Sequence, residues 1–385
     1  MPLPPSRPPR RGGPVAVLLL AAFALSACAS RPEGVLVPVG PPPPGSATVD
    51  MLAATTRAPS AERGVLFSGE RGEGVSYTNL VVSIPPGRPV GTVQWPNPRA
   101  IDARSSFAVS SVTDVPPGDI GTWFRRVKGS KRRVLIFVHG FNTRFDVAVF
   151  TYAQLVHDMG TDVVPVLFTW PSRGRVLHYN FDRESTNFSR TDLADVIRAA
   201  SASPEVDDVV VLAHSMGAWL TVEALRQIAL QNGRVPAKVS NVILASPDLD
   251  IDVFRRQVTE MGPQRPQITI FVSHRDRALR LSGLIAGRVA RVGAIDFTEE
   301  AKAARLGAAT GIVVIDLSRV ESGDALNHGQ FANSPPVVRL LGERLIAGQS
   351  IDEETFTGSD VAHDVAQTVG NVMAAPFIVF TAGRK

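Results

Sequence analysis

The feature that most constrains the fold of this chain is a series of six short apolar runs, each about as long as one β-strand. They lie at residues 134–138, 163–168, 209–213, 239–245, 268–272 and 311–315. Runs without alternating polar residues are typical of strands buried on both faces, as in a parallel sheet between two layers of helices. The intervening segments are long enough for helices, and residues 145–159 carry apolar side chains three and four positions apart. The sequence therefore predicts an α/β fold with a mostly parallel central sheet and helices on both faces.

The first 27 residues are predicted to be a signal peptide. Three arginines precede an apolar run at 15–27, which is shorter than the roughly 20 residues of a membrane-spanning helix. The run ends in the letters LSAC, which resemble the end of a bacterial lipoprotein signal, in which the cysteine (here Cys28) becomes the first mature residue and carries a lipid. The resemblance implies a lipid anchor in the cell envelope. By resemblance to the sorting rules of such lipoproteins, Ala29 instead of an aspartate after Cys28 favours the outer membrane, with the protein facing the periplasm or exterior. The alternative is a cleaved signal with an incidental cysteine.

Composition narrows the function classes. Cys28 is the only cysteine, so an intramolecular disulfide is excluded and a thiolate metal site is disfavoured. The net charge of +4 comes largely from the arginines of the first 27 residues, which contain no acid. The rest of the chain is nearly neutral, and no nucleic-acid partner is predicted. A hydrophobic content of 44% fits one large domain.

The body is predicted to extend over residues 49–349. Residues 28–48 contain four consecutive prolines and are predicted to form an extended tether. Residues 49–131 hold short β-like runs, such as 75–84 and 91–95, and predict a strand-rich part that begins the sheet with antiparallel strands. The catalytic core is expected at 132–349. The tail at 350–385 is expected to dock on the body, with a membrane or a partner protein as the alternative.

A serine nucleophile is predicted at the end of the run 209–213. His214-Ser215-Met216-Gly217 follows this run directly, and a helix is predicted to extend from Met216 to an end at Asn232-Gly233. Such a tight turn from strand to helix exposes the central serine and needs small flanking residues, here Ala213 and Gly217. The usual pattern is Gly-x-Ser-x-Gly, so Ala213 is one methyl larger. The alternative role for Ser215 is an N-cap, which would not require Gly217.

A serine hydroxyl needs a base, and the base needs an orienting acid. In one large class of serine hydrolases the chain order is serine, acid, histidine. Asp276 follows the run 268–272, and His328 follows the run 311–315, so both are predicted at strand ends in this order. For the acid, Asp248 and Asp250 remain alternatives. The other candidate bases, all less favoured, are His157, His178, His214, His274 and His363.

Two backbone amides are predicted to stabilise the oxyanion. One belongs to Met216, the residue after the nucleophile, and the other to Phe141, which follows Gly140 after the run 134–138. His139 is predicted to brace this loop by hydrogen bonding. Asp248, Asp250 and Asp252 alternate as in a calcium loop, but the required glycine and glutamate do not follow. No metal or other cofactor is predicted.

These residues resemble an α/β-hydrolase, and more narrowly the bacterial esterase/lipase-like family catalogued as a domain of unknown function. The resemblance rests on "VLIFVHGFNTRF", "LFTWPSRG", "VVVLAHSMGAWL", "ILASPDLD", "VSHRDRAL" and "NHGQF", and covers about residues 49–346. It implies that Ser215, Asp276 and His328 form a catalytic triad, with Phe141 and Met216 as the oxyanion hole. It also implies that the segment Trp170-Pro171-Ser172 lines the site.

The predicted function is that of a serine hydrolase that cleaves carboxylic esters through an acyl-enzyme. The expected partners are a small-molecule or lipid ester as substrate and a membrane reached through Cys28. An acyltransferase or thioesterase with the same triad is one alternative, because the sequence does not identify the acceptor. The other is a lipid-anchored binding module on a hydrolase scaffold that no longer turns over.

Overall fold

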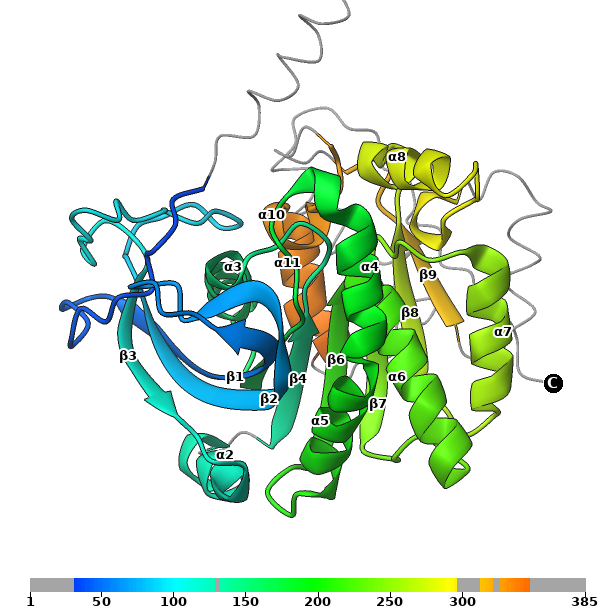
Figure 1. The fold of residues 1–385 in the computed structure, drawn as a ribbon, viewed down its shortest axis with the longest axis horizontal. Coiled ribbons are helices and arrows are strands. Elements are labelled where there is room, and N and C mark those ends of the chain that lie inside the picture. The colour runs from blue at the N-terminus through cyan, green and yellow to red at the C-terminus, as the bar shows by residue number, and fades with distance from the viewer. Residues whose placement is uncertain (1–30, 129–131, 296–311, 321–325, 347–385) are drawn as a thin grey trace, which may run out of the picture. The chain divides into compact units, whose positions relative to one another are not determined.

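The computed structural model describes residues 31–128, 132–295, 312–320 and 326–346 (Figure 1). The chain divides into the units Met1–Pro32 and Glu33–Lys385, and the fold is that of the second unit. The predicted signal peptide, Cys28 and the tail at 350–385 lie outside the described residues. Within the described part, no helix is long and apolar enough to cross a bilayer.

The fold is built on a sheet of nine strands in the described part, in the order β3-β2-β1-β5-β4-β6-β7-β8-β9. From β1 to β9 all neighbouring strands are parallel, whereas β2 is antiparallel to both β1 and β3. The predicted sheet and its strand-rich start are therefore confirmed. The strands are β1 Ala47–Pro59, β2 Phe67–Ile84, β3 Ala108–Asp114, β4 Arg133–Val138, β5 Val164–Thr169, β6 Asp208–His214, β7 Val239–Ala245, β8 Gln267–Val272 and β9 Ile312–Asp316.

Helices cover both faces of the sheet, as predicted, and each face has its own apolar core. One face packs against α3 (Phe145–Met159), α10 (Gln330–Asn333) and α11 (Pro335–Leu340). The other face packs against α2 (Ile120–Lys128), α5 (Arg190–Ala202), α6 (Met216–Asn232) and α7 (Ile251–Met261), of which α5 and α6 lie in front of the sheet in Figure 1. The remaining elements are α4 Tyr179–Phe188, α8 Arg277–Ile285, the short turns η1 Pro117–Asp119, η2 Val176–His178 and η3 Val292–Ala294, and the π-helical turn η4 Leu341–Ile346.

The local sequence explains where the helices of the core end. The helix predicted at 145–159 is α3, and it ends at Gly160, which has a φ of 62°. The helix predicted from Met216 is α6, and it ends at Gly233, which has a φ of 75°. Both glycines adopt the left-handed conformation that closes a helix and that other residues enter only at a cost.

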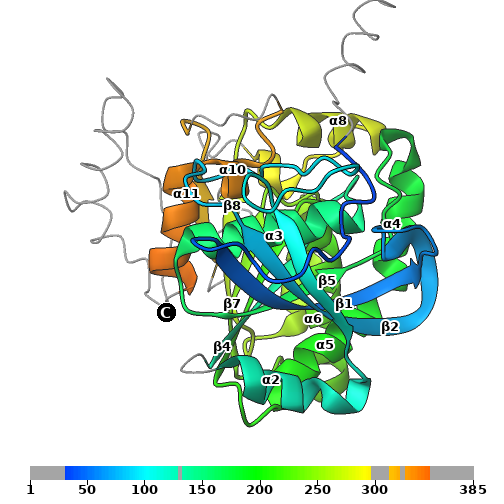
Figure 2. The same ribbon diagram turned by 90° about the vertical axis from the view of Figure 1, so that its left-hand side faces the viewer.

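Two predictions for the N-terminal part are wrong. Residues 91–95 form a loop and no strand, because the segment starts at Gly91, whose left-handed φ of 80° does not fit an extended strand. Trp95 in this loop packs edge-on against Phe150 of α3 at a ring distance of 5.6 Å. The part of the predicted tether within the body unit is not free. Val35 and Leu36 are fully buried, and the Leu36 amide donates a 2.9 Å hydrogen bond to the Gly64 carbonyl. Burial of Val35 and Leu36 therefore holds this segment on the body, although the prolines that follow favour an extended chain. Figure 2 shows the side of the sheet at which the N-terminal strands β1 and β2 lie.

Candidate active site

The direction in which successive strands are added to the sheet reverses between the parallel strands β4 and β6. The chain leaves β4 through α3 toward β5 on one side, and leaves β6 through α6 toward β7 on the other. The two strands pair with Val138 opposite Ala213, so the loops that follow them begin side by side. In parallel α/β sheets, a crevice opens at such a switch point beyond the carboxyl ends of the strands.

Ser215 lies at this point in a strained turn between β6 and α6. Its φ of 53° and ψ of −119° are unusual for a residue with a side chain, and such backbone strain costs on the order of 1–3 kcal/mol. Its side chain makes no capping hydrogen bond to α6, so the N-cap alternative lacks its defining contact. A strained serine at this position is typical of a nucleophile elbow.

Two glycines allow this turn to form. A Cβ on Gly217 would lie 2.3 Å from the His139 carbonyl oxygen, and a Cβ on Gly140 would lie 2.9 Å from the Ser215 Cβ. Neither position has room for a side chain. The loop after β4 therefore lies directly against the candidate nucleophile.

His328 and Asp276 meet at the same edge of the sheet. The Nδ1 atom of His328 lies 2.7 Å from Oδ2 of Asp276, which is fully buried. The other carboxylate oxygen accepts the Leu279 amide at 2.9 Å and so caps α8. His328 also lies beside His214, the residue before Ser215, with ring centroids 4.6 Å apart. Segments separated by more than a hundred residues of sequence thus converge next to Ser215.

The two alternative acids have other partners. Asp248 lies 3.1 Å from Nε of Arg291 and accepts a 3.0 Å hydrogen bond from the Tyr179 hydroxyl. Asp250 accepts the amides of Asp252 and Val253 at 2.8 and 2.9 Å, and so caps α7. Of these three carboxylates, it is that of Asp276 that contacts the imidazole of His328.

His139 holds the loop after β4 in one conformation. Burial, together with the nearby Arg57 guanidinium, keeps the pKa of His139 well below its ordinary value, so the ring is neutral. Its Nε2 lies 3.2 Å from both Nη2 of Arg57 and the Trp170 amide, and Nδ1 lies 2.8 Å from the Gly140 carbonyl oxygen. Because an arginine can only donate, Nε2 must accept and Nδ1 must carry the proton. The Gly140 carbonyl is thereby fixed.

This hydrogen bond also orients the Phe141 amide. The peptide bond between Gly140 and Phe141 is trans, so its N–H points away from the carbonyl that His139 binds. The next two amides are occupied, since Asn142 donates to Asp182 at 3.2 Å and Thr143 donates to Ser172 at 3.0 Å. For the Phe141 amide, no hydrogen-bond acceptor occurs in the part of the chain that the structure describes. The Met216 amide opens α6 and has no acceptor within that helix.

The family assignment agrees with this geometry. Residues 118–344 match the family model described as "Alpha/beta hydrolase of unknown function (DUF900)". The chain belongs to this family. A protein of Nostoc sp. called uncharacterized is 28% identical over a 157-residue alignment that covers 32% of this chain and 41% of the relative, so less than half of the relative is matched.

Solved structures resemble this α/β hydrolase at low identity. They include a hyperthermophilic esterase from the archaeon Pyrobaculum calidifontis, at 12% identity and a TM-score of 0.36, covering 86% of this chain and 92% of that one. An ester hydrolase from the metagenome of Lake Arreo has 13% identity and a TM-score of 0.34, covering 86% and 96%. At these values the resemblances carry no argument about activity.

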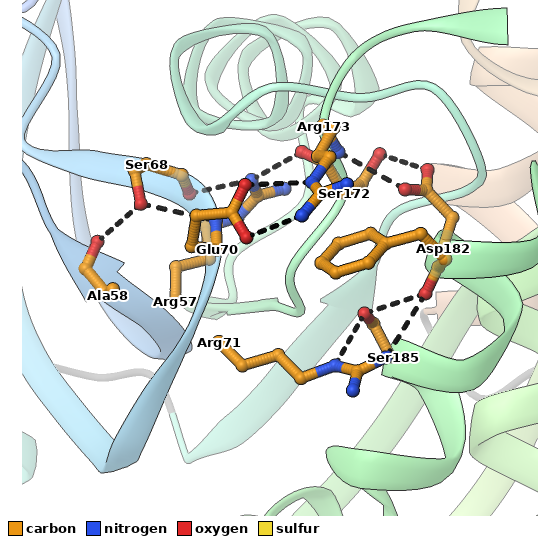
Figure 3. A network of polar contacts seen from close by, with 10 residues as sticks. Arg57, Ala58, Ser68, Glu70, Arg71, Ser172, Arg173, Asp182 and Ser185 are labelled. Carbon is orange, nitrogen blue, oxygen red and sulfur yellow. Dashed lines mark hydrogen bonds and ion pairs between the residues drawn. The ribbon is translucent and has the colours of Figure 1, made fainter. Parts of the chain in front are cut away.

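The α/β hydrolase contains a buried arginine that no sequence motif predicts. Arg57 of β1 is 1% exposed. Figure 3 shows it next to Ser68 and Ser172. Its Nη1 donates hydrogen bonds to the carbonyl oxygens of these two serines, at 3.2 and 2.9 Å. Its Nη2 donates to the Thr143 carbonyl at 2.7 Å. Burial lowers the pKa of Arg57 to about 9, and the nearby Asp182 opposes this shift. The arginine thus binds the loop after β4 from behind.

The prediction that the segment Trp170-Pro171-Ser172 lines the site is wrong. Trp170 and Ser172 are fully buried. The Trp170 ring stacks on His139 at 4.8 Å, and its Nε1 donates to the His139 carbonyl at 2.9 Å. The Ser172 hydroxyl donates to Asp182, a carboxylate whose pKa is raised by burial. The reason is topological: β5 pairs with β4 on the side away from β6, so its loop supports the β4 loop and does not face Ser215.

Proposed function

We propose that this α/β hydrolase cleaves carboxylic esters through an acyl-enzyme formed on Ser215. The observation that carries the proposal is the 2.7 Å contact between His328 and the buried Asp276, next to the strained turn at Ser215. A carboxylate fixed to Nδ1 leaves Nε2 of the imidazole as the acceptor for a hydroxyl proton. Asp276 is assigned as the orienting acid, because Asp248 and Asp250 have structural partners.

The reaction follows from these roles. Ser215 Oγ attacks the ester carbonyl while His328 takes its proton, and the carbonyl oxygen gains the negative charge. The amides of Phe141 and Met216 stabilise this oxyanion. When the C–O bond of the ester breaks, His328 gives the proton to the leaving alcohol, and the acyl group stays on Ser215. Water then attacks the acyl carbon while His328 takes one of its protons; the bond between the acyl carbon and Ser215 Oγ breaks, His328 returns the proton to Oγ, and the acid product leaves.

A panel of p-nitrophenyl esters with increasing acyl length tests the proposal. We expect wild type to hydrolyse at least the short esters and Ser215→Ala to lose this activity. Ser246→Ala is a matched control, because Ser246 is also buried, follows the neighbouring strand β7 and has a φ of 47°. It should keep wild-type rates. Hydrolysis by Ser215→Ala at the wild-type rate would overturn the assignment.

We also propose, from the sequence alone, that a lipid on Cys28 holds the enzyme at the cell envelope. Growth with radiolabelled palmitate should label the wild-type protein and leave Cys28→Ser unlabelled. Equal labelling of both proteins, or of neither, would remove the anchor from the account while leaving the proposed chemistry intact.

A further inference from the structure

The helix that begins directly after Asp276 carries apolar side chains on its exposed face. On α8, Leu281, Leu284 and Ile285 are 54%, 61% and 57% exposed, while Leu279 and Ser282 on the opposite face are buried. A surface helix normally presents polar residues to solvent and buries its apolar ones. Here the outward face is itself partly apolar. In Figure 1 this helix lies at the top of the view, above β8.

Further exposed apolar residues lie on the segments that contact α8. Leu177 of η2 is 95% exposed, and the Tyr179 hydroxyl just after it lies 3.2 Å from Ser282 of α8. Leu326 is 51% exposed, and its carbonyl accepts the Arg277 amide at 3.0 Å. We call these exposed side chains the rim patch: Val176, Leu177, Leu281, Leu284, Ile285 and Leu326.

The rim patch borders the candidate active site. Leu326 lies two residues before His328. The ring of Tyr179, which follows η2, packs against Phe141 at 5.2 Å. Whatever docks on the rim patch is therefore held close to Ser215. Exposed apolar surface of this kind usually marks an interaction site.

The charge of the same region favours an anionic surface as the occupant. Residues 273–295 contain a single acid, Asp276, and it is fully buried. Arg275, Arg280 and Arg288 are exposed, and none of them has an ion-pair partner in the described part of the chain. A helix that presents leucines and arginines together is typical of segments that lie on anionic membranes, where the apolar residues insert and the arginines meet lipid phosphates.

We propose that α8 and the rim patch dock on an anionic phospholipid bilayer and present the Ser215 site to esters held there. The second half of this statement rests on the proposed function, whereas the docking itself does not. The bilayer supplies both an apolar layer for Leu281, Leu284 and Ile285 and negative charge for the arginines around them. The lipid-ester substrate class would then be selected by location as well as by the shape of the site.

Vesicle sedimentation tests the docking. The full chain carrying Cys28→Ser, which leaves no thiol for a lipid, is mixed with vesicles of phosphatidylcholine alone or with 30% phosphatidylglycerol added. We expect tighter binding to the anionic vesicles, by about fivefold for each arginine engaged. Arg280→Gln with Arg288→Gln should lose most of this preference. Leu281→Ser with Ile285→Ser should weaken binding to both vesicle types.

A matched control lies at the far end of α6. Leu230 is 58% exposed and Arg234 is exposed, so Leu230→Ser with Arg234→Gln makes the same kinds of change away from α8. It should bind like the parent chain. Equal binding by the control and the α8 variants would overturn the proposal. So would a parent chain that self-associates through Leu281 without binding vesicles, because the occupant would then be a second copy.

Activity on a soluble ester separates this inference from the proposed function. The α8 variants should hydrolyse p-nitrophenyl acetate at the parental rate, since none of the changed residues belongs to the proposed triad or oxyanion hole. Normal hydrolysis without any selective vesicle binding would remove the docking and keep the chemistry. Selective vesicle binding by a chain whose hydrolysis is unaffected by Ser215→Ala would keep the docking and remove the chemistry.

Discussion

Asp276 and Asp248 follow neighbouring strands of the sheet, and both carboxylates are buried, yet their surroundings differ. Asp276 faces the imidazole of His328 and the first turn of α8. Asp248 faces the Arg291 guanidinium and two hydroxyls, those of Tyr179 and Ser282. The first is paired with a group that can exchange protons near neutral pH, the second with a permanent cation.

This difference shows that burial of a carboxylate does not by itself identify a catalytic acid. A buried carboxylate paired with arginine is stabilised as a charge and ties segments together, here α7, α8 and the start of α4. A buried carboxylate paired with histidine instead fixes a tautomer and supports a positive charge that appears only during the reaction. The partner determines which role is available.

The largest expected effect separates the two carboxylates by activity. Asp276→Asn should lower kcat by about 10⁴-fold, because an amide no longer holds His328 in the tautomer that accepts the serine proton. Asp248→Asn should leave kcat of the folded protein close to wild type. Ester hydrolysis at saturating substrate, with the folded fraction measured by circular dichroism, checks both. If Asp248→Asn has the larger effect, the assignment of the acid is reversed.

The second effect distinguishes Asp248 from Asp276 by its contribution to the free energy of unfolding. Arg291→Met leaves Asp248 buried without its cation and should lower the free energy of unfolding by about 3–5 kcal/mol. Adding Asp248→Asn to this variant removes the unpaired charge and should restore part of the loss. Urea unfolding of wild type, Arg291→Met, Asp248→Asn and the double variant measures this coupling. Additive losses would show that Arg291 and Asp248 do not act as a pair.

A third effect extends the comparison to a buried cation. Arg57 binds His139 and the Thr143 carbonyl, so Arg57→Met should loosen the loop that carries the Phe141 amide and lower kcat by about 10²-fold, with KM little changed. Arg71, in the same network in Figure 3, is exposed and bonds to Ser185 of α4, so Arg71→Met is the control. The affinity for a trifluoromethyl ketone inhibitor should fall with kcat in the Arg57 variant alone. A change in KM alone would argue against this positioning role.

The smallest effect concerns His139, whose pKa is well below its ordinary value when the protein is folded. Below about pH 6.5 the unfolded chain binds a proton at this position and the folded chain does not, so the free energy of unfolding falls as the pH falls, by up to about 1.4 kcal/mol per pH unit. His139→Gln should be less stable at pH 7.5 but should show a shallower decline. Urea unfolding at pH 7.5, 6.5 and 5.5 gives both slopes, and equal slopes would contradict a neutral buried ring.

The sheet from β4 to β9 was predictable because buried parallel strands leave continuous apolar runs in the sequence. The turn at Ser215 was also predictable, since Gly217 and the strand before it are local features. By contrast, β1 was not identified as a strand, because four of its thirteen residues are alanines, which are depleted in strands, and the charged residues Asp50 and Arg57 interrupt its apolar run. Arg57 left no local pattern, since His139, Thr143 and Ser172 lie 82 to 115 residues further along the chain.

The segment at 170–172 shows a different limit. Its position after a strand was read correctly, but its place in the site depended on strand order, which the local pattern does not encode. Because β5 pairs with β4 on the side away from β6, Trp170 and Ser172 support the β4 loop from behind. The predicted tether shows the same limit. Val35 and Leu36 were assigned to a free segment, but they belong to an apolar core whose other residues come from strands that are remote in sequence.

The most direct test of the central claim is covalent labelling by a fluorophosphonate probe, followed by intact-mass measurement and peptide mapping. Wild type should gain one probe mass at Ser215, Asp276→Asn should react far more slowly, and Ser215→Ala should stay unlabelled. A wild-type protein that remains unlabelled while a control esterase reacts, or a label that persists in Ser215→Ala, would contradict the claim that Ser215 is an activated nucleophile.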